Sequence, residues 1–167
     1  MKPTMFTKEH TNGDARLDEW REVTPGERFI IRTSSEDTNG LYSMLEVVAD
    51  PQNGVPIHIH ANEDEHFIIL DGTAHMAIGD KRWDLESGSS VTVPKGVPHA
   101  WCNRSNTPLR MLVLFSPGGI DELFRENARR DNVDVMALAD KFGTRMIGPA
   151  LFDNIYTVLS PRAEMRR

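Results

Sequence analysis

Short apolar runs separated by turn-forming residues dominate the middle of the chain. Between residues 28 and 115, the runs RFIIRT, LYSMLEVV, EHFIIL and LRMLVLF have the length and composition of β-strands. The segments between such runs contain Gly, Pro, Asn and Asp, as in SSEDTNG, ADPQNGVP and NRSNTP. Many short strands with turns of this kind are typical of a β-sandwich or a β-barrel. We therefore predict an all-β barrel over residues 28–115.

The two flanking segments have a different character. Residues 1–27 are polar and are predicted to form an N-terminal arm. Residues 116–167 are predicted to form a helical extension, because IDELFRENARR places apolar residues at helical spacing and VDVMALADKF precedes Gly143, a favourable helix end. Both helices are amphipathic, so we expect them to pack on the barrel or on a partner subunit.

Composition and charge exclude several classes of function. The formal net charge of −6 argues against a nucleic-acid partner, because phosphate binding requires a basic surface. We expect no membrane partner, since no apolar run approaches the length of a membrane span, and residues 1–14 lack the apolar stretch of a secretory signal. The single cysteine, Cys102, excludes an internal disulfide and fits a cytoplasmic protein.

Two histidines and a glutamate lie close together in the segment GVPIHIHANEDEHFIILDG, residues 54–72. On a strand, His58 and His60 leave the same face with Cα atoms ~6.6 Å apart. If the turn ANED closes a hairpin, His60 lies opposite Glu65 and His58 opposite Phe67. A buried carboxylate must be paired or must coordinate a cation. A His–Glu hydrogen bond would also satisfy this hairpin, so the segment alone leaves both interpretations open.

A second segment favours the metal interpretation. The stretch GSSVTVPKGVPHAWCN, residues 88–103, reads as a strand, a rigid Pro–Gly turn and a strand that starts near His99. Such a turn can direct a third imidazole towards the first two. We therefore predict that His58, His60, Glu65 and His99 bind one divalent metal. The residue types suit Fe, Mn, Ni, Co, Cu or Zn and do not distinguish among them.

These residues resemble the two motifs of the cupin family. The first motif, G(X)5HXH(X)3–4E(X)6G, is matched by His58, His60, Glu65 and Gly72, although Gln52 stands where the leading glycine is expected. The second motif, G(X)5PXG(X)2H(X)3N, is matched in full, and its residues are Gly88, Pro94, Gly96, His99 and Asn103. The resemblance implies a double-stranded β-helix, or jelly-roll barrel, around the four ligands. A weaker resemblance, carried by EDEHFIILDG, the PGG segment and the helical tail, is to the quercetin-dioxygenase-like branch.

The function expected from this site is oxygenation of a small enolic or phenolic substrate chelated to the metal. In related dioxygenases the glutamate equivalent to Glu65 is thought to take the substrate proton, so Glu65 is a candidate catalytic residue; a role as a fixed ligand is equally open. Two alternatives remain. One is a metal-dependent isomerase or epimerase of a sugar or keto acid, and the other is a non-catalytic protein that binds or senses a small ligand.

Strand alternation provides candidates for the substrate pocket. Phe67 and Ile69 share the predicted face of Glu65, and Trp101 shares that of His99. Phe67 and Trp101 could equally belong to the core. By the same alternation His66 should face away from the metal, and His75 is either a surface residue or a partner of a ligand. Open sheet edges and the N-terminal arm lead us to expect a homodimer.

Overall fold

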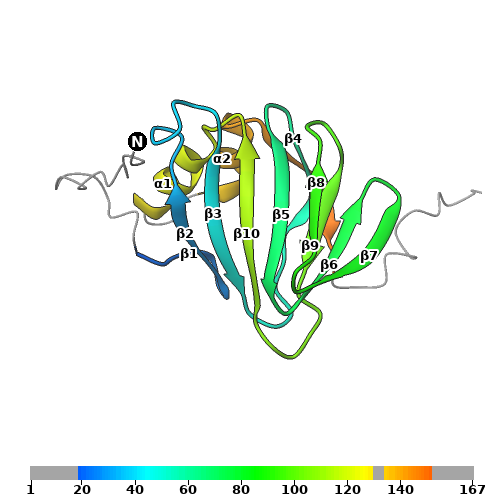
Figure 1. Cartoon of the computed structure of the whole chain (residues 1–167). Helices are drawn as coiled ribbons and strands as arrows, with labels where there is room; N and C mark the ends of the chain where they lie inside the picture. Colours follow the sequence, from blue (N-terminus) through cyan, green and yellow to red (C-terminus); the bar gives the residue numbers. More distant parts are fainter. Residues whose placement is uncertain (1–18, 130–133, 152–167) are drawn as a thin grey trace, which may run out of the picture.

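The computed structural model describes residues 19–129 and 134–151 and forms two antiparallel sheets that face each other (Figure 1). One sheet has six strands in the order β1-β2-β3-β10-β5-β8, and the other has five in the order β11-β4-β9-β6-β7. This arrangement confirms the predicted all-β jelly-roll barrel. The strands are β1 Arg21–Thr24, β2 Glu27–Thr33, β3 Ser43–Ala49, β4 Pro56–His60, β5 Asp64–Asp71, β6 Thr73–Ile78, β7 Lys81–Glu86, β8 Ser90–Val93, β9 His99–Cys102, β10 Leu109–Ser116 and β11 Thr144–Ala150.

The core lies between the sheets and follows from side-chain alternation. In β10, buried residues alternate with more exposed ones, as expected when one face of a strand points into the barrel. Its inward residues meet those of β3 and β5, with which β10 pairs on either side. The largest fully buried side chains include Leu45, Phe67, Ile69, Met76, Leu109 and Met111. The inward face of each of these strands is therefore the one that carries its alternate apolar residues.

The sheets extend beyond residues 28–115 at both ends. Strand β1 and the first residue of β2 come from the segment predicted as an arm, and they form a hairpin with a turn at Gly26, which has a φ of +84°. Strand β11 was not predicted. It comes from the segment predicted as a helical extension and pairs with β4. The remainder of the arm, residues 1–18, and residues 152–167 lie outside the described residues.

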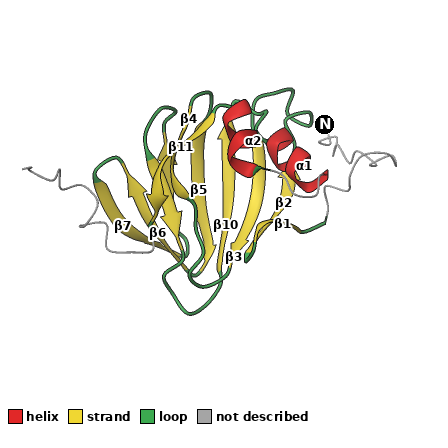
Figure 2. Ribbon diagram, turned by 180° about the vertical axis from the view of Figure 1, so that it is seen from behind, coloured by secondary structure: helices red, strands yellow, loops and turns green. Residues whose placement is uncertain are grey.

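The two predicted helices are present and lie together beside the barrel (Figure 2). Helix α1 spans Asp121–Arg129 and contacts β1 and β3, whereas α2 spans Val135–Lys141 and contacts β11. The carboxylate of Asp134 caps α2 by accepting hydrogen bonds from two backbone amides. Gly143, with a φ of +81°, follows the helix end as predicted. Among the described residues, neither helix is long and apolar enough to cross a membrane.

The departure from the first motif has a simple structural explanation. Gln52 occupies the position expected to be glycine, and its φ of +61° is the left-handed conformation that glycine adopts most easily. The loop therefore keeps its shape with a different residue. Gly54 meets a separate requirement, because a Cβ atom there would collide with the carbonyl oxygen of Trp101. Its backbone bridges to Cys102 at the end of β9.

Asn103, the last residue of the second motif, braces the loops at the end of β9. Its side chain is fully buried and donates hydrogen bonds to the carbonyl oxygens of Ala49 (3.0 Å) and Thr107 (2.8 Å). Its Oδ1 accepts hydrogen bonds from the backbone amide and the hydroxyl of Ser105. The amide is thus fully used by the protein and holds these loops together.

Candidate metal centre

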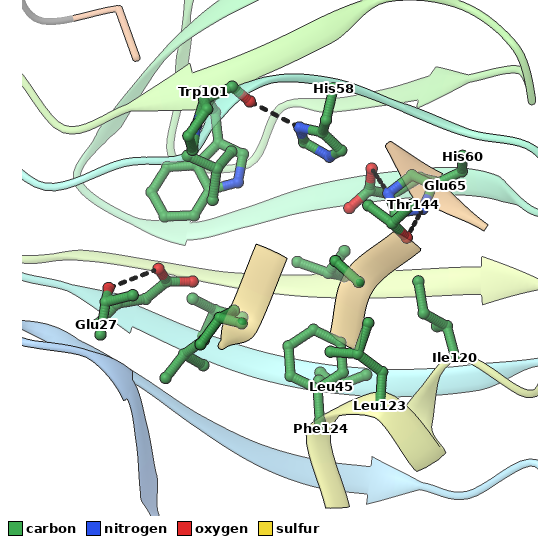
Figure 3. Close-up of a pocket in the computed structure, with 18 of the residues that line it drawn as sticks. Glu27, Leu45, His58, His60, Glu65, Trp101, Ile120, Leu123, Phe124 and Thr144 are labelled. Atoms are coloured by element: carbon green, nitrogen blue, oxygen red, sulfur yellow. Dashed lines mark hydrogen bonds and ion pairs between the residues drawn. The ribbon is translucent and has the colours of Figure 1, made fainter. Parts of the chain in front are cut away.

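Three strands bring the four predicted ligands together. His58 and His60 leave the inward face of β4, and His58 is in register with His99 on the neighbouring strand β9. Glu65 belongs to β5, in the opposite sheet, and points across the barrel towards them (Figure 3). The site is therefore assembled from both sheets.

The predicted β4–β5 hairpin is wrong. Strand β4 pairs with β9 and β11, while β5 pairs with β10 and β8, so His60 does not lie opposite Glu65 in a ladder. The four-residue turn carries the chain from one sheet to the other instead of reversing it within a sheet. Strand β4 still turns His58 and His60 inward, and β5 still turns Glu65 inward. The ligands therefore converge across the barrel and not along one sheet.

The donor atoms are close enough to share one cation. One ligand atom from each of the four residues lies within 4.8 Å of the others, and all four side chains are buried. Nε2 of His99 lies 2.6 Å from Oε2 of Glu65, and Nε2 of His60 lies 3.2 Å from the same oxygen. The rings of His58 and His99 are separated by 4.2 Å between centroids. The structure thus brings together the complete predicted ligand set.

Each imidazole is oriented by an oxygen on its other nitrogen. Nδ1 of His58 lies 2.8 Å from the carbonyl oxygen of Pro56, and Nδ1 of His99 lies 2.9 Å from that of Val97. Nδ1 of His60 lies 2.9 Å from Oγ1 of Thr144 in β11. When Nδ1–H donates to an oxygen, Nε2 of a neutral imidazole carries the lone pair that binds a metal. All three Nε2 atoms are therefore prepared as ligands.

The polar atoms at the centre of the site fit a divalent transition metal. Nε2 of His60 is buried and has no hydrogen-bond partner among the described residues, although it lies 3.2 Å from Oε2 of Glu65. Both nitrogens of His99 face oxygens. Without a metal, Nε2 must therefore carry a proton and donate a hydrogen bond to Glu65. A cation bound by these atoms would replace that proton and satisfy His60. His58, His60, Glu65 and His99 would hold it.

The electrostatics of the cluster favour cation binding. Burial lowers the pKa of His58 to about 4, and nearby His99 adds to the effect, so His58 is neutral at neutral pH. Burial would raise the pKa of Glu65, but contacts with His60 and His99 outweigh it and hold this pKa well below its usual range. Burial would lower the pKa of His99, yet the hydrogen bond and charge of Glu65 raise it. An ionised carboxylate therefore lies at the centre of the imidazoles.

Two residues near the site were not identified from the sequence. Thr144 is buried and orients His60, but it belongs to β11, which was not predicted. Glu63 is also buried, and one of its oxygens lies 4.0 Å from Nδ1 of His60 without a hydrogen bond. Burial raises the pKa of Glu63. No spacing rule links Thr144 to the motifs, because only the folded sheet brings it beside His60.

Replacement of Thr144 by valine tests the orienting contact. Valine keeps the size of the side chain but removes the oxygen beside Nδ1 of His60. We expect metal affinity to fall roughly tenfold, as is usual when such a supporting partner is lost. Titration against a competing chelator measures the change. Thr92→Val is the matched control, because Thr92 contacts His66 through a similar pair (2.6 Å) away from the cluster and should leave the affinity unchanged.

A cavity of about 310 Å³ opens from the ligands into the barrel. This volume is within the range of small-molecule sites. His58, His60 and Glu65 line it on one side, and apolar side chains from both sheets form most of its wall. The helices also contribute, so the C-terminal extension does more than pack on the barrel. The helix-region residues that line the cavity are Ile120, Leu123, Phe124, Val135, Met136 and Ala139.

The three residues predicted for the substrate pocket occupy different places. Trp101 lines the cavity (Figure 3). Phe67 and Ile69 face inward as predicted, but they are fully buried core residues outside the lining of this cavity. Phe67 packs behind the site, with its ring centroid 6.4 Å from that of His99. Glu27, a residue that the sequence analysis placed in the arm, lines the cavity instead.

The remaining described histidines lie outside the cluster. His66 faces away from the ligands, as predicted from alternation, and contacts Thr92. Nδ1 of His75 lies 2.6 Å from Oδ1 of Asp84 on the neighbouring strand β7. His10 is outside the described residues.

Comparisons with known proteins agree with the fold and the site. The chain is 28% identical to mannose-1-phosphate guanylyltransferase 2 of Escherichia coli O157:H7 over 102 residues, which are 60% of this chain and 21% of that protein. It is 23% identical to quercetin 2,3-dioxygenase of Bacillus subtilis over 106 residues, 59% of this chain and 31% of that protein. The chain therefore spans less than a third of either relative.

A solved structure and a family model both match the barrel region of the chain. The structure of KdgF from Halomonas sp. superposes with a TM-score of 0.57 at 19% identity, covering 62% of this chain and 90% of that one. At this identity the likeness concerns the fold. Residues 45–115, which contain all four ligands, match the cupin domain family. Residues 45–115 are therefore similar to the cupin domain, and the structure gives this region a jelly-roll barrel with a three-histidine, one-glutamate cluster that could hold a metal.

Proposed function

We propose that this protein is a metal-dependent oxygenase whose substrate is a small enolic or phenolic compound chelated to a divalent metal. The observation that carries the proposal is the position of the ligand cluster, in which three imidazoles and one carboxylate converge and His58, His60 and Glu65 line an apolar cavity of small-molecule size. Three neutral imidazoles and one carboxylate leave a divalent cation with a net positive charge. Such a centre favours an anionic chelator.

The ligands, Glu65 and the apolar wall would have different roles in this reaction. A divalent cation held by the four ligands would supply the Lewis acidity that keeps an enol or phenol deprotonated. Glu65 is placed to receive the proton, because its carboxylate lies within the cluster and lines the cavity. The apolar wall excludes water from the deprotonated substrate. Both atoms of dioxygen would enter the product, so the substrate supplies the electrons and no separate reductant is required.

The lining of the cavity favours this substrate class over a sugar. Aliphatic and aromatic side chains such as Leu45, Trp101 and Phe124 surround the space beside the ligands. A sugar requires many hydrogen-bonding partners, whereas a planar aromatic compound packs well against such a wall. The relative named as a quercetin 2,3-dioxygenase supports the same choice. The other relative is named as a guanylyltransferase, so the names alone do not select a reaction.

Turnover with and without dioxygen tests the proposal. Natively purified protein, with its metal content measured, is incubated with a panel of enols and phenols that bear a neighbouring carbonyl group. We expect substrate loss and matching oxygen uptake in air, and no turnover under anaerobic conditions. Equal turnover without dioxygen would contradict the proposal and indicate an isomerase or epimerase. Tight binding without turnover in air would contradict it in favour of a binding or sensing protein.

A further inference from the structure

A second polar group faces the cavity at a distance from the ligand cluster. Glu27 is the first residue of β2, whose alternation turns Glu27, Phe29 and Ile31 inward. Arg28 between them faces outward, towards Asp50. Figure 3 shows the Glu27 carboxyl at one side of the cavity and His60 with Glu65 at the other. The cavity is therefore apolar in the middle and polar at two ends.

The carboxyl of Glu27 has little support from the protein. Its side chain is 7% exposed, and within the described part of the chain its hydrogen-bonding partner is the hydroxyl of Thr24, at a long distance of 3.4 Å. No lysine, arginine or histidine among these residues pairs with it. Burial accordingly raises its pKa to about 7, against the opposing effect of Thr24. Burying a carboxyl with so few partners lowers the stability of the fold. Its presence in the cavity therefore suggests a role in binding.

The position of Glu27 suits contact with a bound molecule. Val23, Thr24, Val47 and Trp101 line the cavity with it, and among these four only Thr24, which already contacts Glu27, carries a side-chain acceptor. Thr24 engages only Oε2, so Oε1 is available to a ligand. A carboxyl group accepts a hydrogen bond in either protonation state, through a charged oxygen or through its carbonyl oxygen. The chemical group that fits beside it is therefore a hydrogen-bond donor.

We propose that Glu27 is a specificity-determining residue that accepts a hydrogen bond from a hydroxyl group at the end of the ligand far from the metal. This inference deepens the proposed function and rests on it for the anchoring of the ligand at the metal end. The ligand class becomes narrower: a planar chelating enol or phenol that carries a second hydroxyl across an apolar spacer. Glu27 selects such compounds from otherwise identical ones that lack the hydroxyl.

Binding of matched probes to the full chain tests this role. The protein is loaded with Zn²⁺, which has no redox chemistry, so that binding is measured without turnover. The probes are flavonol, which carries the chelating hydroxyl and carbonyl, and its three derivatives with one added hydroxyl on the phenyl ring, in the ortho, meta or para position. We expect at least one derivative to bind the wild type roughly tenfold more tightly than flavonol, the effect of one hydrogen bond to a buried acceptor.

Two substitutions separate the acceptor from the shape of the residue. Glu27→Gln keeps an acceptor oxygen in the same place and should keep most of the preference. Glu27→Leu keeps a similar volume, removes the acceptor and should reduce the preference to less than about twofold. Zn²⁺ content and the melting temperature of each variant confirm that the site and the fold are intact. Leucine is tolerable here because it replaces a carboxyl with few partners.

The outcomes distinguish this inference from the proposed function. Hydroxyl derivatives that bind the wild type no better than flavonol, or a preference that survives in Glu27→Leu, would overturn the role of Glu27. Flavonol binding that is unchanged in His58→Ala/His60→Ala would overturn chelation at the metal. Even then, a preference for the hydroxyl derivatives that is lost only in Glu27→Leu would support the role of Glu27. Failure of all four probes to bind the Zn²⁺-loaded protein would overturn both.

Discussion

Replacing His58 and His60 together with alanine is expected to abolish metal binding. The wild type should contain about one divalent metal per chain, and the double variant should contain less than roughly a tenth of that amount. Only His99 and Glu65 would remain, and two protein ligands rarely hold a transition metal against dilution. The loss should be nearly complete because both removed imidazoles are buried and oriented by other groups. Elemental analysis of natively purified protein measures the change.

The chain supplies a matched control for this variant. His66→Ala/His75→Ala also removes two strand histidines, but both lie outside the ligand cluster. Its metal content should equal that of the wild type. The fold of the first variant should survive, since His99 still neutralises the buried Glu65 across 2.6 Å, and circular dichroism checks this. Equal metal content in the wild type and in the His58/His60 variant would contradict the assignment of the site.

Glu27→Gln is expected to change how stability depends on pH. Burial raises the pKa of Glu27 in the folded protein from 4.5 to about 7. Folding therefore favours the protonated form, and this favourable contribution is present below pH 4.5 and lost as the pH rises through 7. The loss is on the order of 3 kcal/mol, from about 1.4 kcal/mol per pKa unit. Glutamine does not titrate, so the variant should gain that much relative to the wild type between pH 4 and pH 8.

Thermal unfolding across this pH range provides the measurement. For a chain of this length, a change of 3 kcal/mol corresponds to roughly 6–12 °C in melting temperature. Glu86→Gln, at an exposed position in β7, is the control for the loss of one charge. Its melting temperature should follow that of the wild type at every pH. A difference between Glu27→Gln and the wild type that stays constant with pH would show that the Glu27 carboxyl does not titrate between 4.5 and 7.

The ligand set could be predicted from the sequence because it depends on local geometry. His58 and His60 leave one face of any strand, and the Pro94–Gly96 turn directs His99 from the next segment. The pairing of strands could not be predicted in the same way. Residues 61–63 are compatible with a hairpin, but they carry the chain from one sheet to the other. Which of the two occurs depends on how all the strands pair in the whole barrel. The sequence therefore identified the four residues that cluster, but not the strand ladder that supports them.

The residues that were missed depend on contacts between distant segments. Strand β11 contains Gly148 and Pro149, which weaken a strand pattern, and its pairing with β4 supplies the order that its sequence lacks. Glu27 follows a Pro–Gly turn and looked like part of a polar arm. Alternation also predicted that Phe67 and Ile69 face inward, which is correct. Alternation could not show that the cavity ends before it reaches Phe67 and Ile69. The extent of a cavity depends on side chains from several strands and not on the pattern of one strand.

The contact between His60 and Thr144 has a consequence for how the protein reaches its active form. These residues are 84 positions apart, yet they lie in register on β4 and β11. During synthesis, the three histidines and Glu65 leave the ribosome well before the strand that orients His60. Closing so long a loop is slow compared with forming local turns. The support of His60 is therefore completed only when β11 pairs with β4, so the ligand cluster depends on the last strand of the five-stranded sheet to be synthesised.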